Sequence, residues 1–469
     1  MHQACLSIVN KYGVNMHPLD TLMKEEYNKI TNGKQFAIKY DIRCVIHAPD
    51  EDIKALFVMD FSLLRDYVNN FSDILSITAT FGAGTVTHRI MPHGKVLEAS
   101  VTLRPLMNVP DYVASSVSKI QEYRFKALLY DNGIKAIEAN SISDNQKSQN
   151  DIEDITAVKF QLINPLQEQL RVKTFGGSIR NANPLSAIRA LLTKYSRLDK
   201  VETHQLVNGV DVAPGYSTDI REHIIIPHLT PVIKLPLVID KLVGGIYPTG
   251  FQYYLQKNMW YIFSPFNVKA YEKSQRTLTV INIVKDKLAQ IEKTFRITPT
   301  QLIIMSTGEV KFNRLSDRHE VNESSGTRFV DAKNVMEGFG VADGNKFTVS
   351  RADNINEFET TNDQKVSLLK ESSVRITTNY LTEYSKIAYK KGAMLQFIWE
   401  NSMDDLILPG MPLRFIYMDG AIPKQVYGCV VALDSSYITD TTGPTQKKFT
   451  NNTIVSCFVE DVIKSSEML

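Results

Sequence analysis

The segment 221–263, REHIIIPHLTPVIKLPLVIDKLVGGIYPTGFQYYLQKNMWYIF, restricts its own backbone more than any other part of the chain. Its runs IIIP and VIKLP are rich in β-branched residues and end in proline, which predicts buried extended segments that stop there. Pro236 suits the first turn of a helix over LPLVIDKLV, and Gly244 and Gly245 can adopt the left-handed conformation that ends it. FQYYLQ and MWYIFS then predict an aromatic hairpin joined by a two-residue Lys-Asn link. We therefore expect a strand, a short helix and a mostly buried hairpin, which together form a scaffold without a catalytic motif.

The length and charge of the chain narrow its class. A chain of 469 residues predicts roughly three domains. Hydrophobic residues make up 43% and charged residues 22%, as in a soluble globular protein, and the formal net charge of +2 excludes a global field that would hold nucleic acid or an anionic membrane. The four cysteines lie far apart, without zinc or disulfide spacing, which indicates reduced thiols in a protein made in a cytoplasm. The N-terminus lacks a signal-peptide pattern and no run of about 18 apolar residues occurs, so we expect neither export by that route nor membrane insertion.

Strand patterns dominate the first third of the chain. A helix is predicted over 18–33 with Asp20 as its N-cap, followed by FAIKYDIRCVIHA, whose apolar residues alternate with polar ones. A helical turn is predicted around Leu63, and ILSITATF, GTVTHRIMP, KVLEASVTLRP and YRFKALLY are each predicted to be strands. This spacing is typical of a barrel or a sandwich over about 35–140.

The rest of the chain mixes helix and strand and then returns to strands. A polar segment at 141–154 is the first linker candidate, and NPLSAIRALLTKY predicts a helix capped by Asn183. In MPLRFIYM, the positions around Met411 and Phe415 are apolar on both sides, which suggests burial between layers or subunits. The predicted class is α+β and strand-rich. Its predicted units are an N-terminal barrel-like domain with a leading helix at 1–150, a mixed domain at 151–300, strands and long polar loops at 301–364, and a C-terminal barrel-like domain at 365–469.

The sequence contains only weak matches to catalytic, metal-binding and nucleotide-binding motifs. His223 and His228 are offset by five residues, which places them on opposite faces of a strand and argues against a metal site. The glycines after ILSITATF and those in GFGVADGNK lack the spacing of nucleotide-binding loops. The acidic clusters at 50–52, 151–154 and 404–405 lack the spacing of a calcium loop and are interpreted as solvated loops. Trp260 and Trp399 are interpreted as core or interface anchors. We predict no catalytic, cofactor-binding or metal-binding residues.

Several segments together resemble a known family. They are FSDILSITATFGAGTVTHRIMPHGKVLEASVTLRP, FQLINPLQEQLRVKTFGGSIRNANPLSAIRALL, the segment 221–263, and LILPGMPLRFIY with YGCVVALDSSYI. In their residue patterns and in their order along the chain, these segments are similar to the central baseplate hub proteins of contractile-tailed bacteriophages, such as those of T-even phages. The resemblance covers about three-quarters of the chain, and no single motif in it is diagnostic.

The resemblance implies a structural virion protein rather than an enzyme. Such hubs are homotrimers in which each subunit contributes two tube-like β-barrel domains, divided between discontinuous segments, so that three subunits make a pseudo-sixfold ring. The implied partners are the hexameric tail tube protein, the trimeric central spike protein and other baseplate proteins. DNA would pass through without sequence-specific binding, in a virion tail baseplate synthesised in the host cytoplasm. Asp41 and Glu98, on the polar faces of their predicted strands, are the candidates to line the lumen.

Three other functions fit parts of the sequence. Another tail component, a wedge or tube-terminating protein, would explain the same strand-rich sequence, but a different number of copies would form its assembly than the three of a hub. A particle-borne cell-wall hydrolase is suggested by the carboxylate clusters, with Asp404 as the residue to test. A carbohydrate-binding adhesin would require exposed aromatic residues such as Tyr253 and Trp260.

Overall fold

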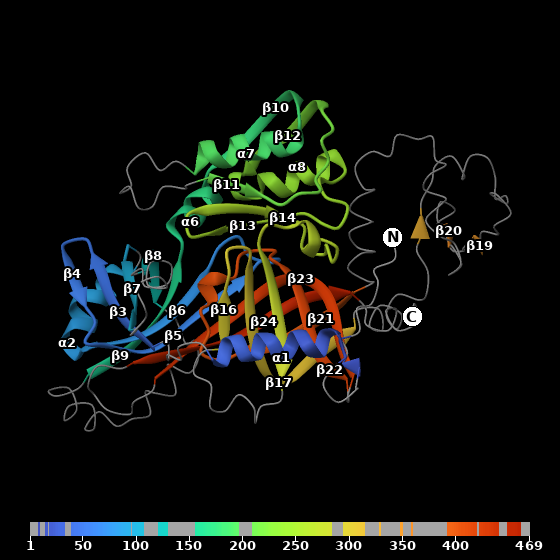
Figure 1. Cartoon of the computed structure of the whole chain (residues 1–469). Helices are drawn as coiled ribbons and strands as arrows, with labels where there is room; N and C mark the ends of the chain where they lie inside the picture. Colours follow the sequence, from blue (N-terminus) through green and yellow to red (C-terminus); the bar gives the residue numbers. More distant parts are fainter. Residues whose placement is uncertain are drawn as a thin grey trace.

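The computed structural model is strand-rich with few helices (Figure 1). The structure describes residues 8–9, 15–16, 18–32, 39–94, 96–106, 121–129, 155–196, 209–283, 294–314, 328–329, 348–349, 358–359, 392–419, 422–439 and 448–460. Fourteen of the strands in these ranges belong to one large sheet with mostly antiparallel pairing. The predicted strand-rich α+β class is confirmed at this level. Within the described ranges, none of the helices has the length and apolarity needed to cross a membrane.

Six strands of the large sheet pair in a closed series, in which the last strand pairs with the first; we call such a closed series a circuit. The strands of this first circuit are, in order of pairing, β15 (Thr277–Ile283), β22 (Pro412–Asp419), β23 (Ile422–Thr439), β24 (Phe449–Glu460), β21 (Gly392–Trp399) and β17 (Gln301–Arg314). β17 then pairs with β15 in parallel, which closes the path. The short β16 (Phe295–Ile297) is added at the side of β17.

The same two long strands, β23 and β24, continue into a second circuit. Its other strands are, in order of pairing from β23, β5 (Phe57–Asp66), β6 (Ile74–Gly82), β9 (Ile155–Ile163), β8 (Gln121–Leu129), β7 (Glu98–Leu106) and β3 (Lys39–Ala48). β3 meets β24 at the pair Tyr40 and Phe449. β4 (Glu51–Lys54) pairs with the far half of β3. Strands from the two ends of the chain thus lie in one sheet, because β23 and β24 are long enough to reach both circuits.

Strand alternation explains where the core lies. In β3, Tyr40, Ile42, Cys44 and Ile46 are all buried, as their alternation with polar residues predicts. One continuous apolar cluster contains buried residues from both circuits, so the two share a core across β23 and β24. α1 (Pro18–Thr31) covers the outer face of the first circuit, where Met23 and Ile30 pack against residues of β15, β17 and β22.

The middle of the chain folds as a separate layer above this sheet (Figure 1). Its helices are α6 (Pro165–Val172), α7 (Pro184–Tyr195) and α8 (Leu235–Val243), and its strands are β10 (Thr174–Ala182), β11 (Gly209–Val212), β12 (Arg221–Pro231), β13 (Gln252–Gln256) and β14 (Met259–Phe263). β10 pairs with β12 as a two-stranded ribbon, and β11, β14 and β13 form a small sheet. This layer has its own apolar core. The predicted cap of α7 is confirmed, because the Asn183 side chain accepts from the backbone N–H of Leu185 and Ser186.

The segment 221–263 folds largely as predicted. β12 is followed by α8 with Pro236 in its first turn, and Gly244 (φ 83°) ends the helix in the left-handed conformation. Gly245 also has a positive φ of 104°. The hairpin link has positive φ at both positions, 50° and 58°, as a type I′ turn requires. The prediction for VIK was wrong, because Val232–Lys234 is a 3-10 helix (η5) that leads into α8.

Two other local predictions were wrong. Residues around Leu63 lie in strand β5 and not in a helical turn, because a β-bulge between Val58 and Asp60 breaks the alternation that would have marked the strand. GTVTHRIMP is helical, as α2 (Ala83–Thr85), η1 (Val86–Ile90) and η2 (Met91–His93). Val86 and Ile90 are both buried, and their spacing of four residues is that of a helix face.

Some remaining predictions concern the chain ends and the polar segments. α1 begins at Pro18, so Asp20 lies in its first turn and is not its N-cap. The linker candidate 141–154, most of the predicted polar loops up to 364 and the start of the predicted C-terminal domain, 365–391, lie outside the described residues. The short strands β1 (Ile8–Val9), β2 (Asn15–Met16), β18 (Arg328–Phe329), β19 (Thr348–Val349) and β20 (Phe358–Glu359) and the 3-10 helix η6 (Tyr271–Lys273) complete the described elements outside the site.

Candidate functional site: a buried charged cluster

A fully buried arginine lies where the two circuits and the middle layer meet. Arg65 is the ninth residue of β5, and alternation after the bulge turns its side chain inward with Phe61 and Leu63. Its side chain is 0% exposed. A buried guanidinium is tolerated only when its charge and its N–H donors are matched by acceptors.

Three carboxylates surround this guanidinium. Arg65 Nε donates to Asp73 Oδ2 at 3.2 Å, Nη1 to Asp404 Oδ2 at 3.1 Å and Nη2 to Asp405 Oδ1 at 2.7 Å. Asp73 lies at the end of the connection from β5, directly before β6, and the other two aspartates begin η8 (Asp404–Leu406). The planar, multiply donating guanidinium is suited to this arrangement, which a lysine could not reproduce.

The carboxylates are held in turn by residues from several elements. Asp404 accepts from Ser435 and Tyr437 of β23 and from Asn451 of β24, each at 3.2 Å. Asp73 accepts from the hydroxyl of Tyr254 in β13 at 3.0 Å. The cluster therefore ties β5, both shared strands, η8 and the middle layer together.

Asp405 connects the cluster to the hairpin turn of the middle layer and to β8. The Lys257 ammonium lies 3.5 Å from Asp405 Oδ2 and donates to the Asp405 backbone carbonyl at 2.9 Å. The Tyr123 hydroxyl donates to the same carboxylate at 3.3 Å. Lys257 is a turn residue of the β13–β14 hairpin, so the turn places an ammonium, on a side chain that is 40% exposed, at the edge of the junction.

The three carboxylates differ in their electrostatics. Burial raises the pKa of Asp73 and of Asp404, although attraction to Arg65 opposes this effect in both. Burial also acts against the charged form of Asp405, but attraction to Lys257 and Arg65 outweighs it and lowers the pKa of that carboxyl. With two cations and three carboxylates, the fully ionised cluster carries a formal charge of −1.

This arrangement is suited to joining parts of the chain. Both oxygens of Asp404 accept two hydrogen bonds each from protein groups, and Arg65 is enclosed by its partners, so the contacts are directed inward. Within the described ranges no group of three or more His, Cys, Asp or Glu residues is arranged to hold a metal ion. Removal of one partner of such a buried set is strongly destabilising, because it leaves uncompensated buried charge.

The interpretation of 404–405 as a solvated loop was wrong. Asp404 is 2% exposed and Asp405 has a side chain only 9% exposed. Sequence reasoning also missed Arg65, because the stretch around it was interpreted as helical. The available signal was a charged residue at an inward position of an alternating strand, two residues after Leu63.

The side chains that were predicted to be core or interface residues are buried in the folded protein. Trp260 is 1% exposed and donates from Nε1 to Ser196 Oγ at 2.8 Å, so the predicted burial of the hairpin is confirmed. Trp399 is 0% exposed and donates from Nε1 to Thr294 Oγ1 at 3.0 Å. Pro236, Met411 and Phe415 are also buried.

The two lumen candidates lie on neighbouring strands, β3 and β7, near opposite ends of their pairing. Asp41 pairs with Arg43 at 3.0 Å, and Glu98 pairs with Arg124 at 2.8 Å. Both carboxylates therefore have a cationic neighbour on the same face of the sheet, which gives this face mixed charge.

Solved structures that are similar to this chain include two tail proteins and a type VI secretion component. A tail protein from Neisseria meningitidis is 9% identical with a TM-score of 0.44, covering 90% of this chain and 97% of that one. The 43 kDa tail protein of prophage MuSo2 from Shewanella oneidensis is 9% identical with a TM-score of 0.43, covering 89% and 98%. A type VI secretion component from E. coli, described as structurally similar to T4 bacteriophage tail proteins, is 8% identical with a TM-score of 0.35, covering 92% and 76%.

No protein-family model matches the chain. No curated protein matches it at a significant level.

Proposed function

We propose that this protein is a structural component of a phage tail baseplate, a hub whose copies form a trimeric, pseudo-sixfold ring. The observation that carries the proposal is the pairing pattern of the large sheet, in which one chain closes two strand circuits that share β23 and β24. We interpret each circuit as a barrel-like unit. Three copies would then present six such units around one axis.

A ring of this kind would adapt one symmetry to another. A threefold object with two similar units per subunit can meet a sixfold tube on one face and a threefold spike on the other. The buried charged cluster supports this role, because it fixes the two units and the middle layer rigidly within one subunit. We propose the tail tube protein, the central spike and other baseplate proteins as partners, and the virion tail as the location.

The lumen of the proposed ring would carry DNA without sequence-specific binding. Asp41 and Glu98 remain the proposed lining residues, and their pairing with arginine would give a lumen of mixed charge. Such a lining would neither hold the phosphate backbone firmly nor repel it strongly. The proposed role involves no catalysis.

Size-exclusion chromatography with light scattering tests the proposal, followed by imaging of the ring. We expect a species of three times 53.0 kDa, or 159 kDa, with a sixfold-like outline. The same measurements are made with the tail tube protein added, in case the ring needs its partner. A compact monomer under both conditions, or a ring of six copies, would contradict the hub and favour another tail component. Turnover of peptidoglycan by the wild-type chain would instead support the hydrolase.

A further inference from the structure

A serine, a histidine and an aspartate form a hydrogen-bonded series on the outer face of the second circuit. The His47 ring has Nδ1 at 2.6 Å from Asp52 Oδ1 and Nε2 at 2.7 Å from Ser100 Oγ. An ionised carboxylate can only accept, so Nδ1–H donates to Asp52, and in the neutral ring Nε2 then accepts from the Ser100 hydroxyl. This is the order of a nucleophile, a general base and the group that orients the base.

Strand pairing brings the three side chains together. His47 lies opposite Asp52 in the β3–β4 pairing, and Ser100 belongs to β7, the neighbour of β3 on its other side. Ile46 and Ala99 are 0% exposed in the core. Side chains alternate along a strand, so the adjacent residues His47 and Ser100 lie on the opposite, outer face. The strands β3, β4, β7 and β8 lie together at one end of the large sheet (Figure 1).

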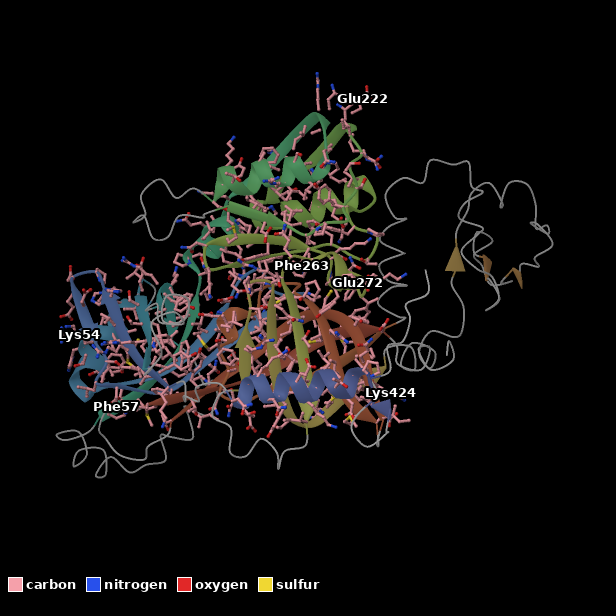
Figure 2. The ribbon with its side chains drawn as sticks, viewed as in Figure 1. Lys54, Phe57, Glu222, Phe263, Glu272 and Lys424 are labelled. Atoms are coloured by element: carbon pink, nitrogen blue, oxygen red, sulfur yellow. The ribbon has the colours of Figure 1, made fainter. Side chains whose placement is uncertain are left out.

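Cations flank Ser100 in its own row across the sheet. Arg124 of β8 lies directly opposite Ser100, where cross-strand Cβ atoms are about 4.5–5.5 Å apart. The Arg124 guanidinium donates from Nε to Glu98 Oε2 at 2.8 Å, which holds it on this face. Lys54 lies in the same row beyond Val45, at the outer margin of the molecule (Figure 2). Among the side chains that the structure describes, the charged or titratable ones one step from this row are Arg43, His47, Asp52, Glu98 and Lys126.

Exposure decreases from the aspartate to the serine. The side chain of Asp52 is 67% exposed and that of His47 is 23% exposed, whereas Ser100 is 9% exposed. Water therefore has limited access to the hydroxyl. This gradient favours a small acyl group that enters beside His47.

We propose that Ser100 is a nucleophile activated by His47, and that this site hydrolyses carboxylic esters of small acyl groups. Ser100 Oγ forms a bond to the ester carbonyl carbon while its proton passes to His47 Nε2; the bond to the alcohol oxygen then breaks, and the alcohol leaves with that proton. Water attacks the acyl-serine by the same route, which releases the carboxylic acid and restores the hydroxyl.

Two neighbours assist this reaction. The Arg124 guanidinium supplies positive charge for the carbonyl oxygen as that oxygen becomes negative. Asp52 is a positioning residue, because it holds the ring of His47 in the required tautomer. The activity is additional to the proposed structural role and does not depend on ring formation.

Covalent labelling of the wild-type chain tests the nucleophile directly. Diisopropyl fluorophosphate phosphorylates activated serines, and peptide mass spectrometry locates the modified residue. We expect the label on Ser100, and we expect labelling to reduce the hydrolysis of p-nitrophenyl acetate to the rate of Ser100→Ala. His47→Gln should slow labelling at least about 100-fold, because a general base contributes that much or more. Asp52→Asn should lower kcat for the ester more than it changes KM, because the amide disturbs the ring tautomer without touching the substrate.

Ser62→Ala is the matched control. Ser62 lies on β5 with Ser76 and Ser436 as its cross-strand partners, so no histidine is opposite it. This variant should be labelled as fast as the wild type, and both serine variants should keep the wild-type melting temperature. A wild-type chain without label on Ser100, or equal labelling rates for His47→Gln and the wild type, would overturn the inference.

The inference and the proposed function fail separately. A trimer by light scattering that carries no label on Ser100 overturns the esterase site and leaves the hub in place. A monomer that is labelled on Ser100 supports the site and contradicts the hub.

Discussion

Replacement of Arg65 by methionine is the most direct test of the buried cluster. Methionine keeps most of the side-chain volume, so the main effect is the loss of the cation that meets three buried carboxylates at 2.7–3.2 Å. Lys257 remains as the second cation but lies near Asp405 alone. We expect the free energy of unfolding to fall by about 3–5 kcal/mol at neutral pH, the range for removing one partner of a buried ion pair.

The loss should depend on pH in a defined direction. Without Arg65, the pKa values of Asp73 and Asp404, already raised by burial, rise further. A carboxyl whose pKa is raised in the folded state favours folding at low pH, and this contribution is lost as pH rises through the folded-state pKa. The penalty of Arg65→Met should therefore be smaller at about pH 5 than at about pH 7.5.

Urea denaturation followed by circular dichroism and tryptophan fluorescence measures both effects. Arg43→Met is the matched control, since Arg43 is 62% exposed in its pair with Asp41, and such a surface pair is worth less than about 1 kcal/mol. A loss for Arg65→Met below about 1 kcal/mol, or a penalty that grows in acid, would refute the reasoning.

Three further substitutions test local features of the fold. Burial raises the pKa of Asp240 to about 6 from 3.8, so its contribution to stability is lost as pH rises through about 6. Asp240→Asn keeps an oxygen acceptor, so at neutral pH, but not near pH 4, it should raise the free energy of unfolding by at most about 3 kcal/mol and raise the melting temperature with it. Asn183→Ala removes the cap of α7 and should cost about 1 kcal/mol by urea denaturation, most of which serine should restore. Gly428→Ala would place Cβ 2.0 Å from the carbonyl oxygen of Phe458 and should cost about 1–3 kcal/mol or more, whereas Gly84→Ala, with its nearest contact at 3.9 Å, should be tolerated; equal midpoints for the two would contradict the steric argument.

Local features of this protein followed from its sequence because their causes are local. The alternation in β3, the Asn183 cap and the positive φ of Gly244 each depend on residues within a few positions of one another. The same holds for the hairpin with Trp260, whose burial follows from its aromatic strands. Where a bulge disturbed the period, as in β5, the same reasoning failed.

Only the tertiary structure decided the closure of the two circuits and the charged cluster. Arg65 and Asp404 are 339 residues apart, and no local pattern relates them. Their contact depends on β23 and β24 being long enough to pair with strands from both ends of the chain. Burial of Asp404 likewise depends on partners from distant strands. For this reason the Asp-Asp pair at 404–405, which is typical of a solvated loop, lies in the interior. Period and turn chemistry act over one strand or one turn, whereas the desolvation of a charge is decided by every element that packs around it.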